Sequence, residues 1–261
     1  LSDLFDNKRR CLRYHYTNVD ALIKILHSEH LRLTHYAKLN DTSEGAFILE
    51  GLKNELPNYG EIHTLLTSNY YLSSFCFYGN LLSQWARYGN VNIGFDYESM
   101  RTDFHIIEDT KGIDHDTSGT EFQECQYISY KSDDYKNIIK EILEKYRYRN
   151  IDFQKIIDQQ YICLSIGSSC FYIKDLVFRE ECEFRIISYL WDRIPFIEKD
   201  KDIKFIKYHF KPENIRRIVI GPGKSQDEDI KKIESYLNKA EKYRHVEIYK
   251  STMPYLKRNN D

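Results

Sequence analysis

The order of apolar and polar residues predicts a chain in which short strands alternate with helices. Residues 11–17 ("CLRYHYT") alternate between the two kinds, as a half-buried strand does. In the following stretch, "NVDALIKILHSEHLRL", apolar residues recur at helical spacing between positions 19 and 26, and Thr17 or Asn18 can cap that helix. The chain therefore opens with a predicted strand followed by a helix.

The same pattern extends to the end of the chain. The further predicted strands are "YYLSSFCFYGN", "VNIGFDY", "ECQYISY", "ECEFRIISYL", "KFIKYHF", "IRRIVIGPG" and "HVEIYKS". The further predicted helices are residues 44–56, "LLSQWARYG" closed by Gly89, residues 133–147, residues 152–176 and "QDEDIKKIESYLNKA". We expect a single mixed α+β domain over residues 1–261, with twisted sheets, flanking helices and a mostly helical insertion near residues 131–176.

One predicted strand carries an unusual charged face. In "FREECEFRII", Glu181, Glu183 and Arg185 occupy alternate positions, while the residues between them look like core. An ordinary half-buried strand has one apolar face and one mixed face. We therefore expect the charged face either to meet solvent or to form the wall of a site.

Composition narrows the classes of function. The 261 residues include 30% charged residues with a formal net charge of −2, which argues against a dominant electrostatic grip on nucleic acid but leaves room for a local basic patch. The chain has no apolar run of the ~18 residues that a membrane span needs, and no signal peptide is expected. Its six cysteines are scattered without a Cys-x-x-Cys pair. They predict reduced, mostly buried thiols in a cytoplasmic protein.

Three further stretches hold candidate site residues. His15 and Thr17 end the first strand, although a histidine in such a place is ordinarily a satisfied core or edge residue. In "LNDTSE", helix capping accounts for Asp41 or Ser43, but not for both Asn40 and Glu44. In "QWARY", Trp85 is expected in the core, and Tyr88 at the helix end can line a pocket.

Two motifs point only weakly to a ligand. The three histidines of "HSEHLRLTH" have no carboxylate or cysteine in step with them, so we expect no metal there. "GPGK" lies between a strand and a helix, but it lacks the spacing of a phosphate-binding loop and predicts a simple turn.

In order, the stretches "YHYTNVDALIKILHSEHLRL", "LNDTSE", "FCFYGNLLSQWARYG", "IGFDY", "FREECEFRII" and "IRRIVIGPG" resemble the bacterial family called domain of unknown function 2971. The resemblance spans nearly the whole chain. Phe178 stands where that family usually has another aromatic residue, often Trp. The family name implies no activity.

A second resemblance does imply one. The strand ending in His-x-Thr, the "ALIKIL" helix and the "LRL" strand look like the start of the ADP-ribosyltransferase fold. That superfamily uses a histidine on the first strand, an aromatic residue in the middle and a glutamate on a late strand. Two helices make the spacing to the late glutamate long here.

The second resemblance assigns a role to each candidate. His15 and Thr17 would bind the ribose hydroxyls of NAD, and Tyr88 (or Tyr78) would stack on nicotinamide. Glu183 or Glu181 would stabilise the positive charge that develops on the sugar. Arg185 would keep Glu183 ionised or hold a phosphate oxygen, and Asn40 is placed in the same cofactor site.

The implied function is an NAD-dependent ADP-ribosyltransferase or NAD-cleaving enzyme, acting as a toxin or phage-defence effector. Its ligand would be a dinucleotide or nucleotide, its acceptor a protein or nucleic acid, and it would need neither a metal nor a membrane.

Two other classes stay open. The first is a non-catalytic sensor or partner-binding module of a bacterial defence system, in which the charged face would be a structural ladder of ion pairs. The second is a metal-dependent nuclease that uses Asp41, Glu44, Glu181 and Glu183 as Mg²⁺ ligands. The nuclease is the weakest of the three, because no lysine accompanies these acids in an Asp/Glu-x-Lys arrangement.

Overall fold

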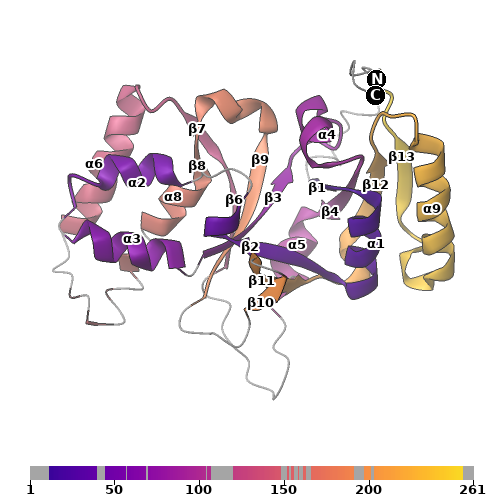
Figure 1. Ribbon diagram of the computed structural model, residues 1–261, viewed down its shortest axis with the longest axis horizontal. Helices are drawn as coiled ribbons and strands as arrows, with labels where there is room; N and C mark the ends of the chain where they lie inside the picture. Colours follow the sequence, from indigo (N-terminus) through magenta and orange to yellow (C-terminus); the bar gives the residue numbers. More distant parts are fainter. Residues whose placement is uncertain are drawn as a thin grey trace.

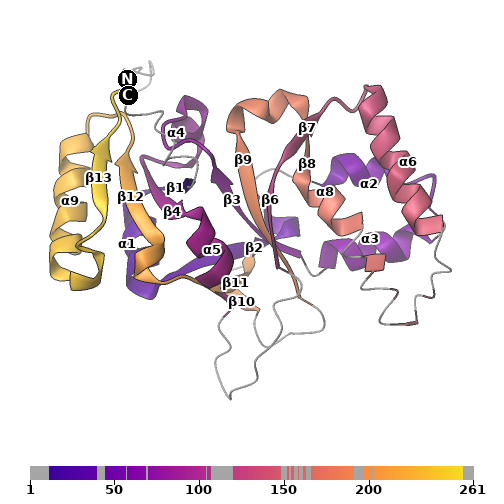
Figure 2. The same ribbon diagram turned by 180° about the vertical axis from the view of Figure 1, so that it is seen from behind.

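The computed structural model describes residues 12–39, 45–56, 58–68, 70–103, 105–106, 120–147, 152, 154–155, 158, 161–162, 166–190, 197–200 and 203–254. Over these residues a large mixed sheet is flanked by helices, so the architecture is α+β, as expected (Figures 1 and 2). No described helix is long and apolar enough to cross a membrane.

Eleven of the described strands belong to the large sheet. They are β1 (Leu12–Thr17), β2 (His30–His35), β3 (Tyr70–Cys76), β4 (Val91–Asp96), β5 (His105–Ile106), β6 (Thr120–Glu124), β9 (Glu183–Tyr189), β10 (Glu198–Asp200), β11 (Ile203–His209), β12 (Ile215–Ile220) and β13 (Glu247–Lys250). A separate pair, β7 (Gln126–Ile128) and β8 (Ile173–Asp175), is parallel, as are β12 and β13. The other described pairs are antiparallel.

The α-helices are α1 (Val19–Ser28), α2 (Ala46–Leu52), α3 (Tyr59–Ser68), α4 (Leu82–Tyr88), α5 (Tyr97–Asp103), α6 (Asp133–Arg147), α8 (Ser168–Tyr172) and α9 (Gln226–Lys239). Short 3₁₀ helices are η3 (Tyr36–Lys38), η5 (Leu176–Glu181), η7 (Pro212–Asn214) and η8 (Glu241–Tyr243). The side chain of Asn18 caps α1 by accepting a hydrogen bond from the backbone N–H of Ala21 at 2.9 Å, as the sequence suggested.

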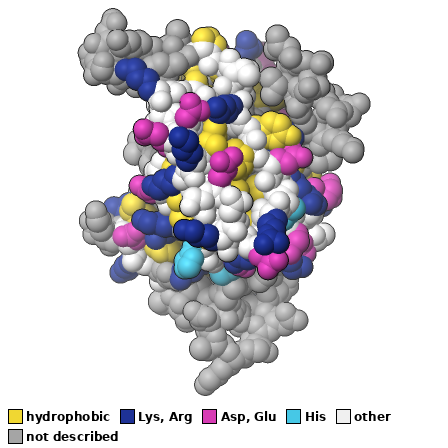
Figure 3. Space-filling model, turned by 90° about the vertical axis from the view of Figure 1, so that its right-hand side faces the viewer, with side chains coloured by type: hydrophobic (Ala, Val, Ile, Leu, Met, Phe, Trp, Pro, Cys, Tyr) yellow, Lys and Arg dark blue, Asp and Glu magenta, His cyan; other side chains and the backbone are white. Residues whose placement is uncertain are grey.

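Three apolar clusters hold these elements together. The largest joins α1, α5 and α9 to the sheet strands β2, β3, β4, β9, β11 and β12. A second joins α2, α3, α6 and α8 to β3 and β9, and it forms a helical part of the molecule, at the left of Figure 1. A third and smaller one packs α4 on β1. On the side that carries α9, acidic and basic side chains are interspersed (Figure 3).

Strand β3 is the centre of the sheet. One of its edges pairs with β9 along the whole strand. Its other edge is shared: β2 pairs near Tyr71 and Leu72, and β1 pairs at Cys76. Strands β1 and β9 therefore flank β3 from opposite sides, and residues far apart in the sequence come together there.

Several boundaries differ from those the sequence predicted. The helix expected over residues 152–176 gives way to strand β8 at Ile173, and "ECQYISY" belongs to two strands, β6 and β7. The helix expected over 44–56 ends at Leu52. Helix α4 and its closing glycine are confirmed: Gly89 has a φ of 132°, and a Cβ there would lie 2.4 Å from the carbonyl oxygen of Thr17. "GPGK" is a turn between β12 and α9.

Candidate functional site

The two faces of the central strands carry different candidates. Directly paired residues of antiparallel strands point to the same face. Tyr14 pairs with Cys76, and Cys76 pairs with Glu183, so these three share one face. His15 and Phe184 occupy the alternate positions and project from the opposite face. The structure therefore does not bring His15 and Glu183 together, although their strands both flank β3.

Glu183 and Arg185 form a buried ion pair on their shared face. The guanidinium of Arg185 donates from Nε to Glu183 Oε1 at 2.7 Å and from Nη2 to Oε2 at 3.2 Å. Its Nη1 donates to the carbonyl oxygen of Phe171 on α8 at 2.6 Å. The side chains of Arg185 and Glu183 are 1% and 4% exposed. The charged face is therefore neither solvent-exposed nor open as a site wall in this state.

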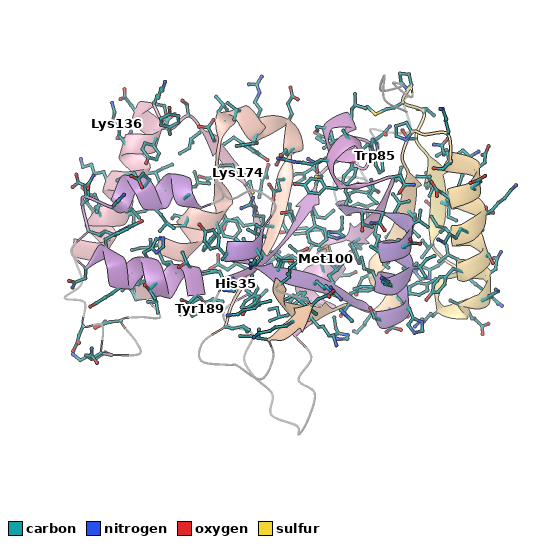
Figure 4. All side chains as sticks on the ribbon, in the orientation of Figure 1. His35, Trp85, Met100, Lys136, Lys174 and Tyr189 are labelled. Atoms are coloured by element: carbon teal, nitrogen blue, oxygen red, sulfur yellow. The ribbon has the colours of Figure 1, made fainter. Side chains whose placement is uncertain are left out.

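Lys174 of β8 connects this pair to Glu181. Its Nζ donates to Glu183 Oε2 at 2.6 Å and to Glu181 Oε2 at 2.7 Å. Its side chain is 5% exposed, and Figure 4 labels it beside β9. The ammonium also lies 5.2 Å from the ring centroid of Phe178, the aromatic residue noted above. A lysine from the helical part of the molecule is thus inserted between two glutamates.

The network reaches the surface through α4. Arg87 donates from Nη1 to Glu181 Oε1 at 2.8 Å, and its side chain is 46% exposed, against 11% for that of Glu181. Five charged side chains thereby run from the surface to the interior: Arg87, Glu181, Lys174, Glu183 and Arg185. We call these five residues the charged network.

The local backbone explains how two glutamates meet one lysine. The sequence predicted that Glu181 lies on the same strand as Glu183. In the structure Glu181 is instead the last residue of η5. Cys182 follows with a left-handed φ of 44°, which is uncommon for a residue with a side chain, and is half-buried rather than core. This residue turns the chain between helix and strand. Glu181 and Glu183 can then approach Lys174 from different directions.

The backbone of Glu183 is also fixed. Its N–H donates to the hydroxyl of Tyr127 on β7 at 2.6 Å, and its carbonyl accepts from the N–H of Cys125 at 3.0 Å. The small β7–β8 sheet therefore holds both the main chain of Glu183 and the lysine that binds its carboxylate.

Electrostatics agree with an ionised pair. Burial by itself raises the pKa of Glu183, but Arg185 and then Lys174 outweigh it and lower the pKa to about 2. The Cys76 thiol, paired across the strands with Glu183, has a pKa raised well above its usual value by burial and then by the negative charges of Glu183 and Glu181. Cys76 is therefore a protonated thiol and a poor nucleophile.

His15 lies in a different environment. Its half-buried ring donates from Nδ1 to the carbonyl oxygen of Ser74 at 3.1 Å, at the edge of β3 between β1 and β2, and packs 5.4 Å from the ring of Phe75. Burial lowers the pKa of His15, and the bond to Ser74 opposes this only in part. Thr17, at the strand end, is buried beside the glycine turn of α4. These two residues have the surroundings of packed sheet residues.

The remaining candidates fall into two groups. Tyr88 belongs to the surface end of the network: burial, followed by the charge of Glu181, raises the pKa of Tyr88 to about 12. Tyr78, named as its substitute, is 52% exposed on the loop before α4. Asn40, Asp41 and Glu44 lie outside the described residues.

No metal site is evident in the described part of the chain, where no group of three or more His, Cys, Asp or Glu residues could hold an ion. The described cysteines, Cys76, Cys125, Cys170 and Cys182, are free thiols, and the first three are buried. The other two cysteines, Cys11 and Cys163, lie outside the described residues.

Sequence reasoning missed Lys174 and Arg87. Lys174 interrupts the apolar run "CFYIKDLVF", and a lone lysine in such a run indicates a buried partner. Arg87 lies within "QWARY" itself, on an exposed position of the predicted helix, and offered no comparable signal.

Comparison with family models, with curated proteins and with solved structures finds no match in any of the three searches. The two resemblances drawn from the sequence remain predictions.

Proposed function

We propose that this protein is a non-catalytic, partner-binding module. The observation that supports this proposal is the state of the charged network. Glu183, which the resemblance to the ADP-ribosyltransferase fold makes the catalytic acid, already binds two cations, and its side chain is 4% exposed. A catalytic carboxylate has to reach the reacting carbon of its substrate, whereas a structural one has to be satisfied where it lies.

The binding surface of this module lies where the network meets solvent. Four of the large apolar side chains that are exposed in the described residues lie on the loop before α4, on α4 and on η5, and α4 contacts η5. They are Tyr78 (52% exposed), Leu82 (44%), Leu176 (41%) and Val177 (76%). We call these four residues and Arg87 the α4–η5 surface. Exposed apolar side chains on contacting elements, with charged ones beside them, suit an interaction site.

The network gives this surface a rigid support. Arg87 of α4 and Glu181 of η5 bridge the two helices at 2.8 Å. The backbone N–H of Phe77 also donates to the carbonyl of Cys182 at 3.0 Å, so the two segments are joined a second time. A preorganised surface loses less conformational entropy when a partner binds.

Site-specific photo-crosslinking in the native cell tests this proposal. A photoreactive phenylalanine analogue replaces Val177 in one version of the protein and Ile203 in a matched control, because Ile203 is also exposed (44%) but lies on β11. We expect a discrete adduct of defined mass from position 177 and none from position 203. Leu82→Asp should remove that adduct while leaving the melting temperature unchanged. Equal labelling at both positions would contradict the proposal.

A second candidate is cleavage of NAD, and one observation favours it. The strands that carry His15 and Glu183 both flank β3, in the chain order that the resemblance to the ADP-ribosyltransferase fold implies. In this candidate Glu183 would have to exchange Arg185 or Lys174 for the substrate. Its test is release of nicotinamide from NAD by the purified protein, with Glu183→Gln as the inactive variant and Glu180→Gln, at an exposed neighbour, as the control. Turnover that a still-folded Glu183→Gln variant lacks and Glu180→Gln retains, with melting temperature as the check on folding, would replace the module by the enzyme.

A further inference from the structure

We propose that the outer face of strands β2 and β11 binds phosphate groups. Four side chains define this face: His30 and Arg32 of β2, and Lys207 and His209 of β11. We call them the basic strip. The strip belongs to neither the charged network nor the α4–η5 surface, so the proposal is independent of the proposed function.

The register of the two strands puts the four side chains side by side. Arg32 pairs directly with Lys207, and His30 pairs directly with His209. On the alternate positions, Leu31 and Leu33 of β2 and Ile206 of β11 are fully buried in the largest core. The strip therefore faces away from that core. Arg32 is exposed, and the other three residues are partly exposed.

The pairing matches cations with cations. Side chains directly opposite on antiparallel strands have their Cβ atoms about 5 Å apart, and like charges in that arrangement repel each other. Asp200 already offsets part of the charge of Arg32, and a phosphate between Arg32 and Lys207 would accept charge-assisted hydrogen bonds from both cations. A phosphate group has enough acceptor oxygens to bind both.

Contacts beneath the strip hold Arg32 in place. Its guanidinium lies 4.3 Å from the ring centroid of Phe205 and donates from Nη1 to Asp200 Oδ2 at 2.7 Å. The Arg32 side chain nevertheless remains 53% exposed. A guanidinium has five N–H donors in a planar fork, so it can bind a phosphate while keeping one acid partner.

The histidine pair extends the strip along the strands. The rings of His30 and His209 have centroids 5.3 Å apart, and Nδ1 of His30 donates to the carbonyl of Ser28 at 3.1 Å, which orients that ring. Two residues along a strand span about 7 Å, so the arginine–lysine row and the histidine row can contact neighbouring phosphates. Two histidines alone would also suit a metal ion, but the adjacent Arg32 and Lys207 repel a cation.

The phosphate groups could belong to a nucleotide or to a nucleic-acid strand. The basic strip itself would contact only the phosphate in either case. The formal net charge of the whole chain is −2, which is compatible with a local basic patch. The ring of Phe205 is 3% exposed beneath Arg32, so it offers no stacking platform for a base. The phosphate, rather than the base, is therefore the recognised group.

The experiment measures binding of two probes to the full chain at low ionic strength. Pyrophosphate is titrated by calorimetry, and a fluorescent single-stranded oligonucleotide by anisotropy. The variants are Lys207→Gln and, as the matched control, Lys204→Gln, which makes the same charge change at an exposed position of the same strand on the opposite face. Melting temperatures of both variants check the fold.

We expect Lys207→Gln to weaken phosphate binding about tenfold, and Lys204→Gln to leave it within about twofold. Stronger binding of pyrophosphate would identify a nucleotide as the source, and stronger binding of the oligonucleotide a nucleic-acid strand. The proposal is overturned if the wild-type protein binds neither probe, or if both variants lose binding equally.

Discussion

Arg13 and Arg185 are both buried, on opposite faces of the same sheet, and they are stabilised in different ways. Arg185 has a carboxylate on two of its donors and a backbone carbonyl on a third. The guanidinium of Arg13 lies over three aromatic rings, with centroids 4.1 Å (Phe77), 4.3 Å (Tyr97) and 5.0 Å (Phe184) away. One site uses opposite charge, and the other uses the negative faces of rings.

The two arginines therefore differ in how strongly each depends on any single partner. A ring face attracts a cation weakly, and losing one ring leaves two others in place. A buried ion pair is different, because losing either member leaves an uncompensated charge in the interior. The charged network should therefore be far more sensitive to single substitutions than the aromatic cage around Arg13.

The largest effect should come from Glu183→Gln. This change keeps the side-chain volume but leaves Arg185 and Lys174 without their shared carboxylate, so we expect a loss of about 3–5 kcal/mol in the free energy of unfolding. Urea denaturation measures it, and Glu180→Gln, at an exposed neighbour, is the control. If both variants cost less than about 1 kcal/mol, the network is not what holds this face together.

The second effect concerns acid. The folded state lowers the pKa of Glu183 from 4.5 to about 2, so its contribution to stability is present above pH 4.5 and is lost as the pH falls towards 2. At about 1.4 kcal/mol for each pH unit, the contribution is about 3–4 kcal/mol. The difference in stability between wild type and Glu183→Gln should therefore shrink over this window. Comparing the two proteins cancels the other titrating groups, including His15, which destabilises the fold below its ordinary pKa of 6.5.

A smaller effect should follow from Arg13→Lys. Lysine keeps the charge but loses the planar group that stacks on the rings, and we expect a cost of about 1–2 kcal/mol. The matched change Arg185→Lys should cost more, because it also removes a two-point contact with a carboxylate. Thermal unfolding of the two variants gives the comparison. Equal costs would mean that the two arginines are held in equivalent ways.

The smallest effect should come from a surface pair. Lys232 of α9 binds Asp20 of α1 at 2.6 Å, but the side chains are 53% and 75% exposed. Lys232→Gln should leave the melting temperature almost unchanged, because water and salt screen such pairs. The measured cost should disappear in 1 M NaCl. A larger cost that persists in salt would show that exposure is a poor guide to the strength of ion pairs here.

Local patterns predicted much of this fold. The alternation in "CLRYHYT", the glycine after "QWARY" and the helical spacing of "QDEDIKKIESYLNKA" depend on neighbours in the chain, and the structure has β1, α4 and α9 there. The same kind of local reasoning placed Lys174 in a helix, because a three-residue strand inside an apolar run has too little alternation to be recognised.

The candidate site depended on information that no single strand contains. Whether His15 and Glu183 share a face is decided by the register of β1 and β9 on β3, and a change of one residue in either register reverses the answer. The break in alternation at Cys182 is equally hidden, because it requires a left-handed backbone at a residue that rarely adopts one.

The pairing of β3 with β9 has a consequence for how the chain reaches its native state. Cys76 and Glu183 are 107 positions apart (183 − 76), and they are neighbours in the central strand pair. Closing so long a loop is entropically costly, and contacts of this kind slow folding. On the ribosome, β3 is made long before its main partner. The edge of β3 that pairs with β9 therefore stays unpaired until β9 has been synthesised. We expect misfolding or capture by a chaperone to begin at this segment, residues 70–76.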